Sequence, residues 1–188
     1  MKKFLVALSI MIFFAATGSA QPVRIARLPI IFQSTIPDEK TCSELETKIA
    51  RAVHIPLNGT LQLAEYLDPK ISAQTFNDIW QENKKARLAD AMTELAEKID
   101  ADIIVCPVLK DFSQYVTFCG WGETILISRA EAELIVYDRR TDELIDKKNS
   151  QFHHDDYNPR GTASFLAQIC FDKVIEKSGL RKKIRDIR

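Results

Sequence analysis

Two histidines and two aspartates stand side by side in the last quarter of the 188-residue chain, at His153, His154, Asp155 and Asp156. Imidazole and carboxylate groups bind Zn²⁺ and other divalent ions in hydrolytic sites, so this cluster suits a small metal-dependent hydrolase. Adjacent residues of a strand point to opposite faces, however, and the two imidazoles cannot readily share one ion there. A site would need a distant third ligand, and His54 is the only other histidine. We therefore favour a polar strand end and keep the hydrolase as the alternative.

A second candidate is the loop Cys119-Gly120-Trp121-Gly122, which follows Phe118 and joins two strand-like stretches. Its glycines permit conformations that let Trp121 project, and tryptophan is enriched at protein contact sites. The competing interpretation is an indole that folds back over the sheet as a lid. We take Phe118 and Trp121 as candidate partner-contact residues. We expect no catalytic, cofactor-binding or metal-binding residue, since the sequence has no serine-hydrolase elbow, phosphate loop or dinucleotide loop.

The first twenty residues have the layout of a secretory signal peptide. Lys2 and Lys3 precede an apolar run, and small residues lead to a cleavage site after Ala20. The run is shorter than a membrane span needs, and no later segment approaches that length, so we expect no transmembrane segment in the mature chain. Cys42 is the first cysteine, which argues against a lipid-modified N-terminal cysteine. The expected location is the periplasm or the exterior.

Charge and cysteine content narrow the choice further. The chain has 26 basic and 26 acidic residues, and removing the two leader lysines leaves a net charge of −2 (24 against 26), which argues against a nucleic-acid binder. The cysteines Cys42, Cys106, Cys119 and Cys170 allow three full pairings in an oxidising compartment, so their disulfide status stays open. Cys106 lies in the apolar run 103–106, where a buried, inert thiol is the commoner outcome.

Hydrophobic periodicity predicts a single α/β domain over residues 21–188, with a mixed parallel and antiparallel sheet and helices packed against it. Helical patterns begin at Pro37-Asp38, occupy 72–99 as one helix or two, and run from Gly161-Thr162 to a glycine cap at Gly179. The basic tail from about residue 181 is expected to fray. The predicted strands are 23–32, with Pro29 near its end, 61–67, 103–109, 114–118, 124–137 and 143–152.

These pieces resemble the α/β domain of the curli-secretion-channel family and of the amino-terminal domain of TolB. The resemblance is carried by the strand end 28–32, the helix end 95–100, the run 101–105 and the strand 132–138 with its turn at 140–142. Asp142 stands where that family's turn has glycine, and Pro107 where a glycine is expected. The chain also resembles small exported proteins of unknown function from diderm Firmicutes. Channel-forming members carry a lipid cysteine and membrane-spanning hairpins, and neither occurs here.

Together these observations favour an exported, non-enzymatic cell-envelope module that binds another envelope protein of unknown identity. The metal-dependent hydrolase built on residues 153–156 is the alternative.

Overall fold

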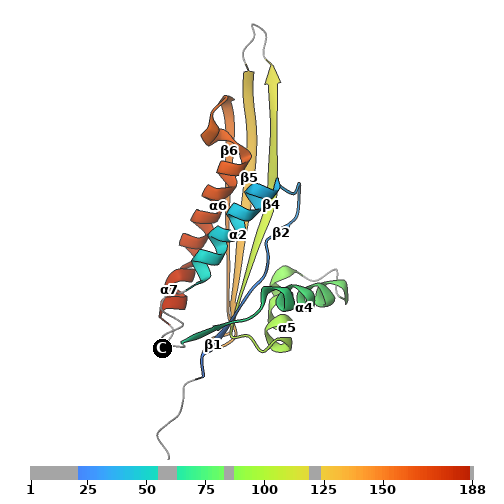
Figure 1. Cartoon of the computed structure of the whole chain (residues 1–188), viewed down its shortest axis with the longest axis vertical. Coiled ribbons are helices and arrows are strands. Elements are labelled where there is room, and N and C mark those ends of the chain that lie inside the picture. The colour runs from blue at the N-terminus through green and yellow to red at the C-terminus, as the bar shows by residue number, and fades with distance from the viewer. Residues whose placement is uncertain (1–20, 55–62, 83–86, 119–123, 187–188) are drawn as a thin grey trace, which may run out of the picture.

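The computed structural model describes residues 21–54, 63–82, 87–118 and 124–186 (Figure 1). In chain order the elements are β1 (Val23–Arg27), β2 (Ile31–Phe32), α2 (Glu39–Val53), β3 (Ala64–Tyr66), α4 (Pro69–Glu82), α5 (Leu88–Lys98), β4 (Ile103–Phe118), β5 (Thr124–Asp138), β6 (Glu143–Asp156), a 3₁₀ turn η1 (Pro159–Gly161), α6 (Ala163–Ser178) and α7 (Leu180–Arg185).

The described strands form one mixed sheet of six strands, which confirms the predicted fold class. The order is β3-β1-β4-β5-β6, with β2 beside Val108 and Leu109 of β4. β1 pairs in parallel with β3 and β4, and β2 pairs in parallel with β4. β4, β5 and β6 form an antiparallel meander, here called the meander, in which long strands follow one another directly. The parallel part and the antiparallel part follow the two halves of the chain, as the sequence pattern predicts.

Two prolines lie at the break between β1 and β2. β1 pairs with β4 as far as Val105, and β2 resumes pairing at Val108. Pro29 lies between β1 and β2, and Pro107 lies opposite that gap in β4. Proline has no backbone N–H to donate to a ladder, and Pro107 lies opposite the gap between β1 and β2, where no strand needs that donor. This arrangement explains how proline fits into a central strand.

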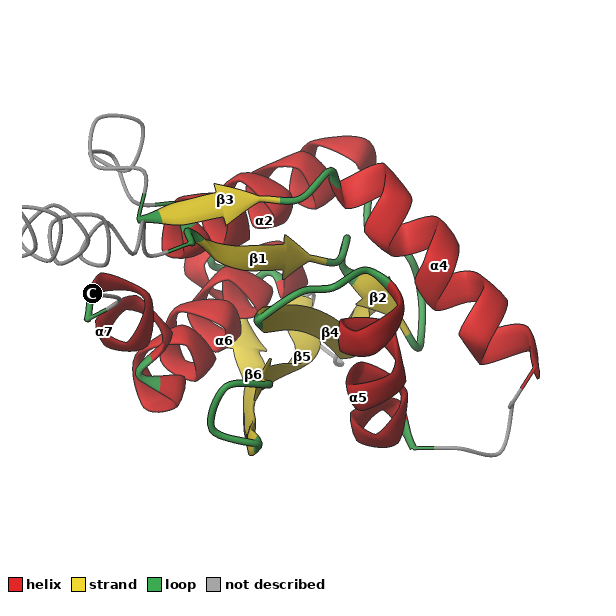
Figure 2. Ribbon diagram, turned by 90° about the horizontal axis from the view of Figure 1, so that it is seen from below, coloured by secondary structure: helices red, strands yellow, loops and turns green. Residues whose placement is uncertain are grey.

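Helices cover both faces of the sheet (Figure 2). One core, which includes Leu45, Ile49, Phe171 and Val174, joins α2, α6 and α7 to the sheet. The other core, which includes Phe76, Met92 and Leu95, joins α4 and α5 to the opposite face. Side chains of a strand alternate between faces, and the four β5 residues predicted to face one way all belong to the first core: Ala130, Ala132, Leu134 and Val136.

The helical stretch 72–99 is two helices. α4 starts earlier than predicted, at Pro69, and ends at Glu82, while Arg87 has extended backbone and precedes a separate helix α5. The ends of the two helices meet, because Lys98 Nζ lies 3.9 Å from a carboxylate oxygen of Glu82. Residues 83–86 lie outside the described part of the chain.

The basic segment after residue 180 is a packed helix, and the expected frayed tail is wrong. Leu180 and Ile184 of α7 are buried against the first core. Lys183 Nζ contacts carboxylate oxygens of Asp138 at 2.9 Å and Glu143 at 2.8 Å. Gly179 has φ of +64°, a left-handed conformation that favours glycine, and it ends α6 as predicted.

The two strands predicted at 103–109 and 114–118 are one 16-residue strand. Its register with β5 shifts between Leu109 and Asp111. Such a bulge places one extra residue in a strand, re-aims the residues beyond it and lets pairing continue. The polar residues at 110 and 111 therefore mark a bulge instead of a loop.

Cys42, Cys106 and Cys170 are free thiols, and Cys119 lies outside the described residues. Cys106 is fully buried in the second core. Burial raises the pKa of its thiol to about 12, with a smaller contribution from the negative charge of Glu133. The thiolate is the reactive form of cysteine, so this thiol is protected both by burial and by its protonation.

We expect Cys106 to resist alkylation in the folded protein. Iodoacetamide at pH 8, followed by peptide mass spectrometry, should modify Cys106 only on unfolding. Replacing it with serine places a hydroxyl in the apolar core and should cost about 1–3 kcal/mol of unfolding free energy in urea. Rapid modification of Cys106 in the native protein would contradict this placement.

Candidate interaction surface

The β4–β5 hairpin extends past the helices at one end of the molecule (Figure 1). α6 begins beside the last third of β4, where the Ala163 backbone N–H donates to the Gln114 side-chain oxygen at 2.8 Å. Residues 115–118 of β4 and 124–127 of β5 continue beyond this point and pair with each other. We call these eight residues the hairpin tip.

Large apolar side chains are exposed at the hairpin tip. Phe118 is 79% exposed, Tyr115 58% and Val116 46%. Among the described residues, eight large hydrophobic side chains are exposed, and five of them lie at this end of the meander: Tyr115, Val116, Phe118, Phe152 and Tyr157. A group of exposed apolar side chains on one projecting element is typical of a contact surface, whereas single ones scattered over a protein are ordinary.

The register places these side chains on both faces of the hairpin. Val116 and Phe118 share the face of Gln114, which contacts α6. Tyr115 lies on the other face, beside Ile127, and in the next strand His154 continues the same row. Of the two predicted contact residues, Phe118 is the last residue of β4, and Trp121 lies outside the described residues.

The histidine cluster is split by the strand that carries it. His153 lies on the α6 side against Gly161, where a Cβ atom on the glycine would come within 2.4 Å of the imidazole. The imidazole of His154 is on the opposite face, 6.1 Å from the ring of Phe152. His54 contacts Tyr66 of β3, at the other edge of the sheet. Within the described residues no three His, Cys, Asp or Glu side chains are grouped to hold a metal ion.

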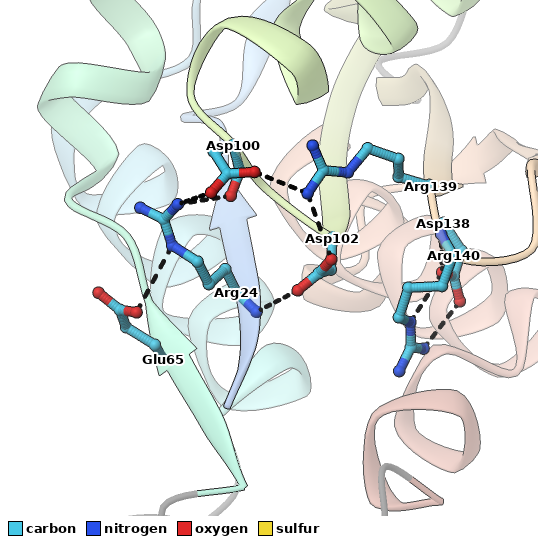
Figure 3. A network of polar contacts seen from close by, with 7 residues as sticks. All are labelled: Arg24, Glu65, Asp100, Asp102, Asp138, Arg139 and Arg140. Carbon is cyan, nitrogen blue, oxygen red and sulfur yellow. Dashed lines mark hydrogen bonds and ion pairs between the residues drawn. The ribbon is translucent and has the colours of Figure 1, made fainter. Parts of the chain in front are cut away.

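A network of charged residues lies at the other end of the sheet, where β1 and β4 begin and β5 ends (Figure 3). The Arg24 guanidinium donates to a carboxylate oxygen of Asp100 at 2.6 Å, and that of Arg139 to the other oxygen at 2.8 Å. The Arg24 backbone N–H donates to Asp102 at 2.9 Å. These contacts join residues that are far apart in sequence and so hold the strand ends together.

Asp100, the carboxylate at the centre of this network, has the wrong pKa for a general acid. Hydrogen bonds from Arg139, and next from Arg24, lower the pKa of Asp100. A general acid at neutral pH needs a carboxyl pKa raised toward neutrality. Asp100 therefore stays ionised, and its role is to link β1 to the turn after β5.

An apolar cavity of about 400 Å³ lies between the β1–β2 connection and helices α4 and α5. Pro29, Phe32, Phe76, Trp80 and Leu88 are among its lining residues, and the rings of Phe76 and Trp80 stack with centroids 5.9 Å apart. Among the described residues that line it, none is an acid, a base or a nucleophile. These residues therefore offer mainly apolar surface.

None of the helices in the described residues is long and apolar enough to span a membrane.

The fold defines a single α/β domain whose mixed sheet carries helices on both faces. No protein-family model matches the sequence. No curated protein matches it significantly either.

Several solved structures are similar in fold. Lipoprotein GNA1162 from Neisseria meningitidis is 13% identical, covering 82% of this chain and 99% of its own, with a TM-score of 0.42. Hypothetical protein CT253 from Chlamydia trachomatis is 13% identical, covering 85% and 98%, with a TM-score of 0.46. The PelC dodecamer from Paraburkholderia phytofirmans is 14% identical, covering 86% and 89%, with a TM-score of 0.41.

Likeness at this level concerns the arrangement of the chain alone, so function is argued below from this chain's own residues. The resemblance to the curli-secretion-channel family and to TolB, and the origin in a diderm Firmicute, gain no support from these comparisons.

Proposed function

We propose that this chain is an exported, non-enzymatic envelope protein that binds a partner protein of the envelope through its hairpin tip. The observation that carries the proposal is the exposure of Tyr115, Val116 and Phe118 on strands that project past the helices. Burial of apolar surface is the main favourable term in protein association, and aromatic side chains dominate the contacts that hold partners together.

The shape of the hairpin tip indicates what kind of partner it fits. The tip has apolar side chains on both faces, and the end of β6, residues 154–156, flanks its β5 strand. A projecting sheet end of this kind suits an apolar groove, with each face against one wall. Phe118 at the end of β4 would be the most deeply inserted of the described residues. Trp121 follows it in the sequence, and we propose that it contacts the same groove.

The test uses the full protein in its native envelope. A photo-crosslinking amino acid in place of Phe118 is expected to give one discrete crosslinked partner. The same amino acid in place of Ile71 provides the matched control, because Ile71 is 61% exposed on α4, far from the hairpin. Trp121→Ala should reduce the Phe118-site crosslink on the order of tenfold, the usual loss for an aromatic contact residue.

Stability measurements separate contact from internal packing. If Trp121 contacts a partner, Trp121→Ala should change the unfolding free energy of the isolated protein by less than about 1 kcal/mol. If the indole covers the protein's own sheet, the loss should be about 3–5 kcal/mol. A loss in that range, or equal crosslinking from both sites, would refute the contact surface.

Metal analysis tests the alternative function. One zinc ion bound per purified chain would favour the hydrolase instead.

The proposed export of the chain can be tested separately through its N-terminal residue. We expect the native protein to begin at Gln21, because cleavage after Ala20 fits the signal-peptide pattern and leaves β1, which begins at Val23, intact. N-terminal sequencing of the protein from fractionated cells checks this. An intact Met1 in the membrane fraction would overturn it.

A further inference from the structure

Strand β6 forms one edge of the sheet and has an unpaired outer side. It is the last strand in the order β3-β1-β4-β5-β6, and within the described residues its ladder partner is β5 alone (Figure 2). At 14 residues it is longer than most strands, which run to about 3–10 residues. A long edge presents a row of backbone donors and acceptors to which another strand can pair.

The two faces of β6 differ. Ile145, Asn149, Gln151 and His153 are half-buried on the side of α6. The even-numbered residues from 146 to 154 are exposed on the open face, and Phe152 among them is 65% exposed. A strand that pairs with β6 must therefore continue the polar surface on the α6 side and cover Phe152 on the open side.

The charges of β6 are arranged so that the strand complements itself. Its first half holds Lys148, and its end holds Asp155 and Asp156, neither of which makes an ion pair within the described residues. The acidic residues of the first half have partners already, because Glu143 contacts Lys183 and Asp146 contacts Lys148. The Lys148 side chain remains 49% exposed beside its contacts with Glu133 at 3.2 Å and Asp146 at 3.4 Å. Two copies of β6 running antiparallel can therefore bring Lys148 of one to an aspartate of the other.

One register satisfies both the charges and the faces. In a symmetric antiparallel pair, opposite residues lie on the same face of the sheet. With Phe152 on the two-fold axis, Phe152 meets its own copy, and Lys148 lies opposite Asp156 of the second copy. Ser150 lies opposite His154 on the same face. On the α6 side, Asn149 lies opposite Asp155, and an amide donor thereby meets a carboxylate acceptor.

We propose that β6 pairs with β6 of a second copy of this chain in that register, so that the two sheets become one. The aromatic pair at the axis covers the exposed Phe152, and cross-strand aromatic and opposite-charge pairs both stabilise such a contact. The interface is small, so we expect a dissociation constant on the order of 1–100 µM. The surface adjoins the hairpin tip, since residues 154–156 of β6 pair with residues 125–127 of β5. The proposed register uses residues of β6 alone, however, so it does not depend on the proposed partner at the tip.

Analytical ultracentrifugation of the purified native protein, from about 1 to 500 µM, measures self-association. We expect a monomer–dimer equilibrium that Phe152→Lys weakens on the order of tenfold or more, since it puts two like charges on the axis. A protein that stays monomeric throughout this range overturns the proposal. The edge of β6 would then be available only to a strand of another protein.

Two further variants test the register. In Phe152→Cys the introduced thiols meet across the axis, so mild oxidation should give a disulfide-linked dimer quickly. In Leu144→Cys, a control on the same face of the same strand, they lie at opposite ends of the interface and should not crosslink. Equal rates for the two variants, each measured against wild type, overturn the register.

Charge exchange gives an independent check that does not depend on disulfides. Lys148→Glu and Asp156→Lys should each weaken self-association, while an equimolar mixture of the two should dimerise, because the mixed pair restores opposite charges at both positions. If Lys148→Glu fails to fold, as judged by circular dichroism, the Phe152→Cys and Leu144→Cys comparison still decides. A folded mixture that remains monomeric contradicts the proposal.

Discussion

Replacing Phe171 with alanine is expected to lower the free energy of unfolding by about 3–5 kcal/mol, the usual cost of removing a fully buried phenylalanine. Phe171 has no exposed surface, and it packs in the core that joins α6 to the sheet. Domains of this kind are stable by only about 5–15 kcal/mol, so this is a large part of the total. For a chain of this length, such a loss should lower the melting temperature by roughly 6–20 °C. Urea unfolding followed by circular dichroism measures the change.

Phe165 provides the matched control. It lies in the same helix and is half-buried, so Phe165→Ala removes the same atoms from a site that still meets water. The expected loss is smaller, about 1–2 kcal/mol. Equal losses for the two variants would show that α6 does not pack on the sheet by the face described.

Replacing Asp138 with alanine is the second large expected effect, a loss of about 3 kcal/mol. The carboxylate is 1% exposed, and it accepts hydrogen bonds from Arg140 at 2.9 Å and from Lys183 of α7 at 2.9 Å. Removing one member of a buried ion pair costs about 3–5 kcal/mol. The lower end applies because Arg140 and Lys183 keep partial contact with water.

Asp100→Ala is the control for that measurement, because the Asp100 side chain is 67% exposed although it contacts two arginines. Exposed ion pairs contribute about 0–1 kcal/mol. The larger loss should therefore come from Asp138, which has fewer exposed atoms and lies under α7. A larger loss for Asp100→Ala would contradict this assignment of the buried anchor.

Asp138 should also account for part of the stability that the protein loses at low pH. Burial by itself would raise the pKa of Asp138, but hydrogen bonds from Arg140 and Lys183 outweigh it and lower the pKa below its ordinary value of 3.8. A group whose pKa is lowered by folding stabilises the protein above its unfolded pKa, and this contribution disappears as the pH falls through the folded value. Asp138→Asn should therefore lose less stability than wild type between pH 5 and about pH 2.

The general architecture could be predicted because its signals are local. Alternating residues in β5 and the 3.6-residue pattern in α2 and α6 reflect which side faces a core, and the glycine cap of α6 needs no distant partner. The β4 bulge was missed because polar residues at 110 and 111 look the same whether a strand ends or shifts its register. α7 was missed because Leu180 and Ile184, at helical spacing, stand among four basic residues, and the carboxylate partners of Lys183 lie elsewhere in the fold.

The candidate surface could be predicted only in part, because the exposure of its residues depends on contacts between distant segments. Phe118 stands beside two glycines and draws attention as a loop neighbour. Tyr115 and Phe152 look like ordinary strand aromatics, and their exposure depends on where α6 begins relative to β4. That distance is set by the three-dimensional packing of segments about 50 residues apart. Aromatic residues at the solvent-facing positions of a strand were the available signal.

The position of β1 between β3 and β4 sets the order in which this fold can be completed. Val23 pairs with Ala64, and Ile25 pairs with Ile103, so the first strand to be synthesised is flanked by strands that follow about 40 and 80 residues later. The meander, by contrast, is made of consecutive strands and can form from contacts close in sequence, which generally form faster. A chain that emerges N-terminus first thus carries β1 without β3 at first and without β4 for about twice as long. We expect β1 to take its place between these two strands only late in folding.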